Sequence, residues 1–343
     1  MRFRRFIIGA LLCGVAFTTA FTTLFAAQRK KKDEITQTLA IPKDPPQAAI
    51  GETRRLVFNV TPMSGKGPLA QQTRDALRAL LKLNGGLPVV HLRAFVAGSG
   101  DIRRVPQLVS EIFSEKKLPL PSVSLVLAGG LPVEDAQVVF EAISVAKRDS
   151  GTTGLDFQAS DPILDPDPSR PTKPLLLKAL DQLARKLRGE SPLSVSCFVS
   201  TMTDGADLSA AIAGRFPSAA SLVVQTQRGP FQGLALCEAT ARGNRVTAER
   251  LAFTGTRVAF GSEQKDAALA FQHLDRDLTE AQATPANIVL THLYPLSTRV
   301  AEMALKTRNS QAPVVVIPFE GLAAIDAGFA VDAIAIVGDA GQR

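Results

Sequence analysis

The chain has 343 residues, 45% hydrophobic and 21% charged, a composition typical of a globular protein of two or three domains. Its formal net charge is +7, but residues 1–32 contain seven Lys and Arg residues and no acid, so the remaining 32 basic and 32 acidic residues balance. Because the body is formally neutral and the chain contains no Trp and one Tyr, we expect no nucleic-acid partner.

The N-terminal segment has the pattern of an export signal. A basic start, MRFRR, precedes an apolar stretch from Phe6 to Ala27, and the small residues Ala26 and Ala27 are typical of a signal-peptidase site. The stretch is also long enough to span a bilayer, so residues 1–27 are predicted to be a signal peptide or a signal anchor. We therefore expect an exported protein that is periplasmic or secreted, or one that residues 6–27 hold in the membrane.

Residues 28–53 are polar, contain three prolines and have no sustained period, so they are predicted to be a flexible linker. Only Cys197 and Cys237 lie beyond the N-terminal segment. In an exported body the two could form a disulfide, but both occur within apolar strands. This position favours two buried thiols that are not paired.

The body contains one pattern three times. Each copy opens with a short strand, which leads to a helix with apolar residues three and four positions apart. The strands are expected at residues 56–58, 155–157 and 251–253, and the helices at 71–83, 174–187 and 267–278. A middle strand and a shorter helix follow, as in VVHLRAFVAGSGDIRRV in the first copy.

Two closing strands end each copy, at 122–130 and 138–146, at 219–227 and 234–242, and at 313–321 and 329–337. Each last strand carries one acid at the corresponding point: Glu141, Glu238 or Asp332. The order β–α–β–α–β–β predicts an α+β fold in which helices pack on one face of a mixed sheet. The predicted units comprise residues 54–149, 150–246 and 247–339.

These copies resemble the RidA family, also called YjgF or L-PSP endoribonuclease, whose fold is chorismate-mutase-like. In the first copy, LVF followed by QQTRDALRALL is similar to the family's opening strand and helix, and LPLPSVSLVLAGGLP followed by VVFEAISV is similar to its closing segments. In the third copy, LAFTGT with Thr254 is similar to a serine–glycine segment of the family. The resemblance covers residues 54–338, and in the second copy it rests mainly on the spacing and on CEATAR.

Family members are homotrimers with ligand clefts between subunits. The resemblance therefore implies that three tandem copies close as an intramolecular pseudo-trimer and that the body is monomeric. In the deaminase members, an arginine holds the substrate carboxylate and a glutamate positions the attacking water. The resemblance maps the glutamate onto Glu141, Glu238 and Asp332, whereas apolar residues occupy the arginine position. Those residues are Val123, Ala220, and Val314 or Val315.

Because the arginine is replaced, we expect a non-catalytic binding or scaffold protein whose inter-unit clefts accept a small apolar or weakly polar ligand. The candidate ligand-binding residues are Glu141, Glu238, Asp332 and Thr254, and no residue is singled out as catalytic. The alternative is an enamine or imine deaminase, a hydrolase, in which another residue supplies the cation. A ribonuclease, the activity in the family's older name, disagrees with the neutral body.

The three histidines, His91, His273 and His292, lack the spacing of a metal site, so we expect no metal and no cofactor. His91 and Arg93 share a strand face with Phe95, which is more typical of a polar sheet face than of a functional site. A membrane contact is expected only through the N-terminal segment.

Overall fold

The computed structural model describes residues 43–149 and 151–338. The export segment predicted at residues 1–27, and residues 28–42 of the predicted linker, lie outside the described residues. Within the described ranges, no helix is both long enough and apolar enough to cross a membrane. All the described residues belong to one compact unit that begins at Lys43.

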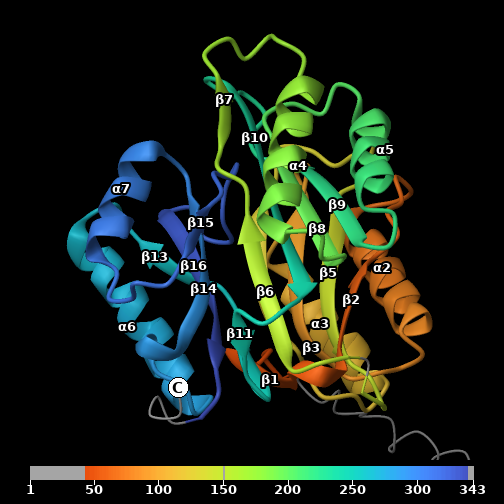
Figure 1. The fold of residues 1–343 in the computed structure, drawn as a ribbon, viewed down its shortest axis with the longest axis vertical. Coiled ribbons are helices and arrows are strands. Elements are labelled where there is room, and N and C mark those ends of the chain that lie inside the picture. The colour runs from red at the N-terminus through yellow and green to blue at the C-terminus, as the bar shows by residue number, and fades with distance from the viewer. Residues whose placement is uncertain (1–42, 150, 339–343) are drawn as a thin grey trace, which may run out of the picture. The chain divides into compact units, whose positions relative to one another are not determined.

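The strands form three sheets with a common order (Figure 1). In each sheet the opening strand pairs antiparallel with the last strand, the last with the middle strand, and the middle strand pairs parallel with the first closing strand. The first sheet comprises β2 (Leu56–Val60), β5 (Val138–Val145), β3 (Val89–Val96) and β4 (Ser122–Leu127). The second comprises β6 (Gly154–Ala159), β10 (Gly233–Arg242), β8 (Pro192–Val199) and β9 (Ala220–Gln225), with β7 (Ile163–Asp165) and β11 (Val246–Thr247) added. The third comprises β12 (Arg250–Thr254), β16 (Ala327–Ile336), β14 (Ile288–Pro295) and β15 (Val314–Val316), with β1 (Ala48–Glu52) and β13 (Arg257–Phe260) added.

Two helices cover the outer face of each sheet (Figure 1). The helices are α2 (Leu69–Leu83) and α3 (Arg104–Glu115), α4 (Lys173–Leu187) and α5 (Gly205–Arg215), and α6 (Gln264–Glu280) and α7 (Thr298–Thr307). The single-turn helices η1 (Thr53–Arg55) and η2 (Pro285–Asn287) precede β2 and β14. The apolar spacing explains the orientation of each helix, since Leu77 and Leu80 of α2 are both fully buried against β-strands of their own sheet. The first helix of each copy lies within a few residues of its predicted range.

Strand β1 occupies part of the predicted linker. It pairs antiparallel with β12, from Ala48 opposite Thr254 to Glu52 opposite Arg250, and the Thr53 amide then donates to the carbonyl of Glu249. Its sequence, AAIGE, does not alternate apolar and polar residues, so this pairing has no signal in the sequence. As a result, the chain contributes an edge strand to the third sheet before it begins the first.

The inner faces of the three sheets share one apolar core, separate from the three cores beneath the helices. At one end of this shared core lies an aromatic cluster of Phe95, Phe198, Tyr294 and Phe319. The ring of Phe319 is 5.7 Å from those of Phe95 and Tyr294 and 6.0 Å, edge-on, from that of Phe198. Each sheet therefore buries both faces, one against its own helices and one against the other two sheets.

Cys197 and Cys237 form a disulfide, so the expectation of two unpaired thiols was wrong. They lie directly opposite each other on β8 and β10, with Cα atoms 4.1 Å apart, in the core beneath α4 and α5. Cross-strand register brings the two sulfurs together, and register cannot be deduced from two apolar segments considered separately.

Candidate functional site

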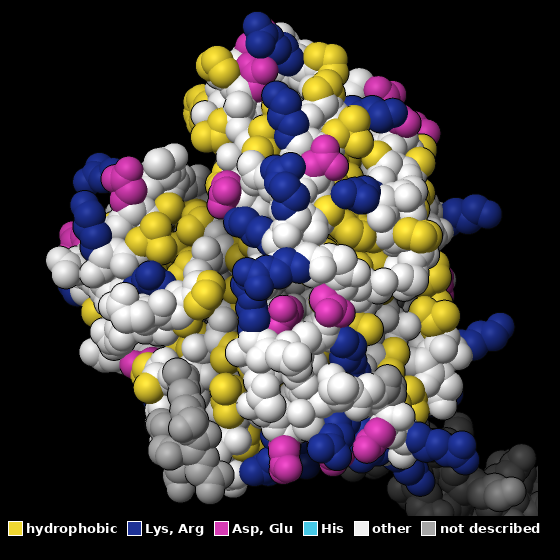
Figure 2. Space-filling view, in the orientation of Figure 1, with side chains coloured by type: hydrophobic (Ala, Val, Ile, Leu, Met, Phe, Trp, Pro, Cys, Tyr) yellow, Lys and Arg dark blue, Asp and Glu magenta, His cyan; other side chains and the backbone are white. Residues whose placement is uncertain are grey.

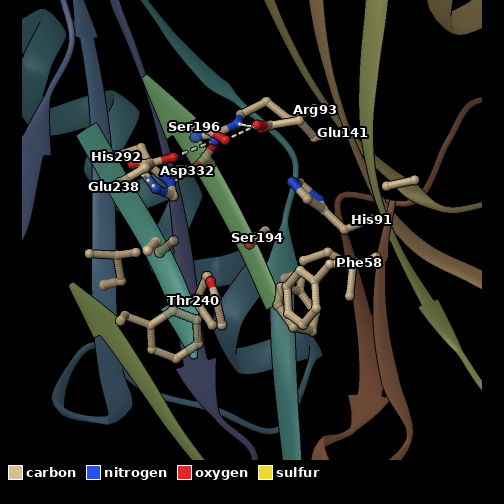
Figure 3. Close-up of a pocket in the computed structure, with 18 of the residues that line it drawn as sticks. Phe58, His91, Arg93, Glu141, Ser194, Ser196, Glu238, Thr240, His292 and Asp332 are labelled. Atoms are coloured by element: carbon tan, nitrogen blue, oxygen red, sulfur yellow. Dashed lines mark hydrogen bonds and ion pairs between the residues drawn. The ribbon is translucent and has the colours of Figure 1, made fainter. Parts of the chain in front are cut away.

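The three predicted acids occupy corresponding places in the three sheets. Each lies on the last strand directly opposite the fifth residue of the middle strand: Glu141 opposite Arg93, Glu238 opposite Ser196, and Asp332 opposite His292. Alternate residues of a strand point to the same face, and these positions point inward. The acids therefore converge with their cross-strand partners (Figure 3). The aromatic cluster is adjacent, since Arg93 lies over the ring of Phe95 and Tyr294 donates to Asp332.

Arg93 connects the first and second sheets. Its Nε lies 2.5 Å from Glu141 Oε2, its Nη2 donates to Glu238, and the Ser196 hydroxyl donates to the other oxygen of Glu141. Arg93 is 7% exposed, and its guanidinium carbon lies 5.3 Å from the ring centre of Phe95. Burial opposes its charge, but the two carboxylates outweigh burial and hold the pKa of Arg93 well above its ordinary value.

His292 connects the second and third sheets. Its Nδ1 lies 2.7 Å from Asp332 Oδ1 and its Nε2 lies 3.2 Å from Glu238 Oε2. Burial opposes the protonated ring, yet the two acids raise the pKa of His292 to about 9, so both nitrogens carry protons at neutral pH. Asp332 also accepts from Tyr294 Oη at 2.9 Å and from Ser124 Oγ at 2.5 Å.

The same contacts keep Glu238 and Asp332 ionised. Burial alone would raise the pKa values of Glu238 and Asp332, but Arg93 and His292 at Glu238, and His292 at Asp332, lower both to about 2. Arg93, Glu141, Glu238, His292 and Asp332, which we call the central network, thus contain two cations and three carboxylates. The central network has one net negative charge.

A cavity of about 80 Å³ adjoins the central network and is lined by all three sheets. Its other walls are apolar and aromatic and include Phe58, Phe157 and Phe253, with the hydroxyls of Ser194 and Thr240 among them (Figure 3). The predicted residue Thr254 also lines it, and its hydroxyl oxygen accepts from the amide of Ala333 at 2.9 Å. The volume admits a molecule of only a few non-hydrogen atoms.

His91 is a further titratable residue of the cavity wall. Its Nδ1 lies 3.0 Å from Ser122 Oγ, and its ring stacks on Phe253 with centroids 6.0 Å apart. Burial, reinforced by the charges of Arg93 and His292 and opposed by that of Asp332, lowers the pKa of His91 to about 4. The imidazole is therefore neutral at physiological pH, unlike that of His292.

The structure differs from the expected site in two respects. Glu141, Glu238 and Asp332 line one shared cavity instead of three separate clefts. The residues assigned to the arginine position also do not define its chemistry. Val123 and Val314 pack on the helix side of their sheets and Val315 packs in the shared core, and none of the assigned residues lines the cavity. The cations come instead from Arg93 and His292, on the middle strands of the first and third sheets.

Arg93, His91 and His292 were interpreted as residues of polar strand faces or as unrelated histidines, and the structure brings all three to the cavity. The available signal was positional: Arg93 and His292 occupy the same place in their copies, two residues before an aromatic residue. His273, on α6, does not line the cavity. Among the described residues, no group of His, Cys, Asp and Glu side chains is arranged to hold a metal ion.

Several basic residues on the surface have acidic neighbours. Figure 2 shows Lys and Arg interspersed with Asp and Glu over the face that contains α4. On this helix, Lys173 Nζ lies 2.7 Å from Asp207 and Lys186 Nζ lies 3.0 Å from Asp161. These exposed pairs distribute the charge in both signs and create no uniform basic surface on that face.

No protein-family model and no curated protein matches the chain. Among solved structures, a YjgF-family protein of Neisseria meningitidis is similar at 17% identity, covering 26% of this chain and 82% of its own, with a TM-score of 0.24. Two further structures are similar over more of the chain. A chorismatase is 12% identical and covers 82% of this chain and 98% of its own, with a TM-score of 0.26. A cyanuric acid hydrolase from A. caulinodans is 12% identical and covers 82% of this chain and 100% of its own, with a TM-score of 0.23. The likeness to YjgF proteins is thus distant and covers about a quarter of the chain, and at these scores none of the matches assigns a function.

Proposed function

We propose that this protein is an exported, non-catalytic binding protein of RidA-like architecture, whose central cavity accepts a small molecule. One observation carries the proposal: both cations of the cavity wall are held by carboxylates of the protein, Arg93 by Glu141 and Glu238 and His292 by Glu238 and Asp332, so neither is free for a substrate. A deaminase of the family type needs a cation that holds the carboxylate of the substrate. Here, carboxylates of the protein already occupy that role.

The protonation states support the same proposal. A carboxylate that activates water must exchange protons near the working pH, whereas Glu238 and Asp332, with pKa values of about 2, remain ionised and hydrogen-bonded. The net negative charge of the central network also disfavours an iminoacid anion, since burying another negative charge beside it is costly.

The alternative is the imine deaminase with a non-standard cation, and one observation favours it: Arg93 lies in the same cavity as Glu141. The discriminating assay is hydrolysis of 2-iminobutanoate, generated in situ, by the purified full-length chain. We expect the rate to equal the uncatalysed rate. A faster rate that Glu141→Gln or Glu238→Gln abolishes would replace the binding proposal with the deaminase.

We further propose that residues 54–149, 150–246 and 247–339 are three RidA-like units that close as an intramolecular pseudo-trimer. The common strand order of the three sheets and the corresponding places of the three acids support this proposal. A self-contained pseudo-trimer leaves no unit face to pair with another chain. Sedimentation of the full-length chain at the mass of a monomer would agree, and a trimer would contradict it.

Export is proposed from the basic start and apolar stretch of residues 1–27, and the Cys197–Cys237 disulfide supports it, because disulfides persist mainly in oxidising compartments. A reporter that is active only after export, fused after residue 60, should give signal. If the reporter stays silent, the proposal fails. If the reporter gives signal, mass spectrometry of the mature N-terminus would distinguish cleavage near Ala26 and Ala27 from a retained anchor.

The binding function is tested by a ligand-observed NMR screen of small neutral, cationic and anionic fragments against the full-length chain. We expect hits that Ser194→Phe abolishes, since the new ring fills the cavity, while Ser114→Phe, at an exposed position of α3, retains them. Circular dichroism spectra and melting temperatures would establish that both variants fold. Failure of every fragment, or equal loss in both folded variants, would refute the proposed site.

A further inference from the structure

His91 presents an unprotonated nitrogen to the cavity. Ser122 Oγ lies 2.8 Å from the carbonyl oxygen of Phe253 and 3.1 Å from that of Val90, and 3.0 Å from His91 Nδ1. The hydroxyl has one proton, and both carbonyls can only accept, so Ser122 donates to a carbonyl and accepts from Nδ1–H of His91. The neutral ring therefore has its lone pair at Nε2, which makes no hydrogen bond within residues 43–149 and 151–338.

Other acceptors surround the same space (Figure 3). The side-chain hydroxyls of Ser194 and Thr240 line the cavity and make no hydrogen bond within the described part of the chain. Thr254 Oγ1 accepts one hydrogen bond, from the Ala333 amide, and retains a second lone pair. A hydroxyl can donate or accept, so His91 Nε2 is the group that requires a donor on the ligand, and the hydroxyl oxygens can accept further hydrogen bonds from the same ligand.

The charges point to the same kind of ligand. Arg93 Nη1 is buried and makes no hydrogen bond among the described residues, so the guanidinium offers the cavity no exposed donor. The central network has one net negative charge, and the rings of Phe58, Phe157 and Phe253 line the wall. Aromatic faces attract cations and also accept apolar groups.

We propose that the ligand of this cavity is a small protonated amine with a short apolar substituent, whose ammonium donates to His91 Nε2 and to the neighbouring hydroxyls beside the central network. The inference rests on the proposed binding function and specifies its ligand class. The substituent contacts the aromatic wall. A carboxylate of the same size would meet the His91 lone pair and the negative network, and both repel it.

The test compares three probes with one four-carbon tail on the full-length chain at pH 7: butylammonium, butan-1-ol and butyrate. We expect butylammonium to bind at least about tenfold more tightly than butan-1-ol, because its hydrogen bonds are charge-assisted. Butyrate should not bind. His91→Phe should weaken butylammonium binding by about tenfold or more, whereas His273→Phe, outside the cavity, should leave it unchanged.

The outcomes separate this inference from the function on which it rests. If neutral or anionic fragments bind the cavity while butylammonium does not, the amine inference is overturned and the binding function stands. Equal affinity for butylammonium and butan-1-ol would overturn it as well. The probe comparison uses the unmodified chain, so a His91→Phe variant that fails to fold does not remove the test. If no fragment binds, the proposed function itself fails.

Discussion

Replacing Arg93 by Met tests how far the central network depends on its guanidinium. Met retains an unbranched apolar stem but leaves the carboxylates of Glu141 and Glu238 in the core without their shared cation. Removing one partner of a buried ion pair costs about 3–5 kcal/mol because the other charge remains buried and uncompensated. We expect Arg93→Met to reduce the free energy of unfolding at pH 7 by that amount, a large part of a typical domain's stability.

The assay is urea unfolding followed by circular dichroism, with Arg74→Met as the matched control. Arg74 forms a partly exposed pair with Glu111 at 3.7 Å, and losing such a pair changes stability by less than about 1 kcal/mol. Adding Glu141→Gln to Arg93→Met should recover part of the loss, since one uncompensated charge is removed. Equal losses for Arg93→Met and Arg74→Met would refute the reasoning that the network is a buried, mutually dependent set of charges.

Three further outcomes are expected in urea unfolding. Stability should be greatest near pH 6.5. Between about pH 4 and 6.5, His91 is protonated in the unfolded chain but not in the folded chain, where its pKa is about 4, so stability falls as the pH falls. Between pH 6.5 and about 9, His292 is protonated in the folded chain but not in the unfolded chain, so stability falls as the pH rises. Each shift corresponds to about 3 kcal/mol, and a midpoint that rises steadily from pH 6.5 to 9 would contradict the assignment. Replacing both Cys197 and Cys237 by Ala, 40 residues apart, should reduce stability by about 4 kcal/mol, and an unchanged midpoint would show that the bridge contributes little. Phe319→Ala should cost about 3–5 kcal/mol by opening the aromatic cluster, and a loss below 1 kcal/mol would mean that the neighbouring rings close the space.

The regular elements were predictable because their signals are local. Apolar spacing of three and four positions places the first helix of the second copy at 174–187, and the structure has it at Lys173–Leu187. The opening strand of the third copy is likewise found at Arg250–Thr254, around its predicted 251–253. Strand β1 lacks any such signal, since its strand character comes from a partner about 200 residues away.

The candidate site was predictable only in part. Repetition identified Glu141, Glu238 and Asp332, because an acid recurs in three similar apolar strands. Arg93 and His292 were not predicted as site residues, because their place in the site depends on strand register and on how the three sheets pack together. Both properties depend on contacts between segments that are distant in the sequence. The same reason applies to the Cys197–Cys237 disulfide.

The position of β1 has a consequence for synthesis. This strand is made before any unit of the body, yet its partner, β12, follows it by about 200 residues. Because the chain is synthesised from its N-terminus, the backbone groups of β1 that pair with β12 have no partner until β12 has been made. The third sheet is therefore completed only by this late pairing, and a chain interrupted before β12 has an open strand that can pair with other molecules.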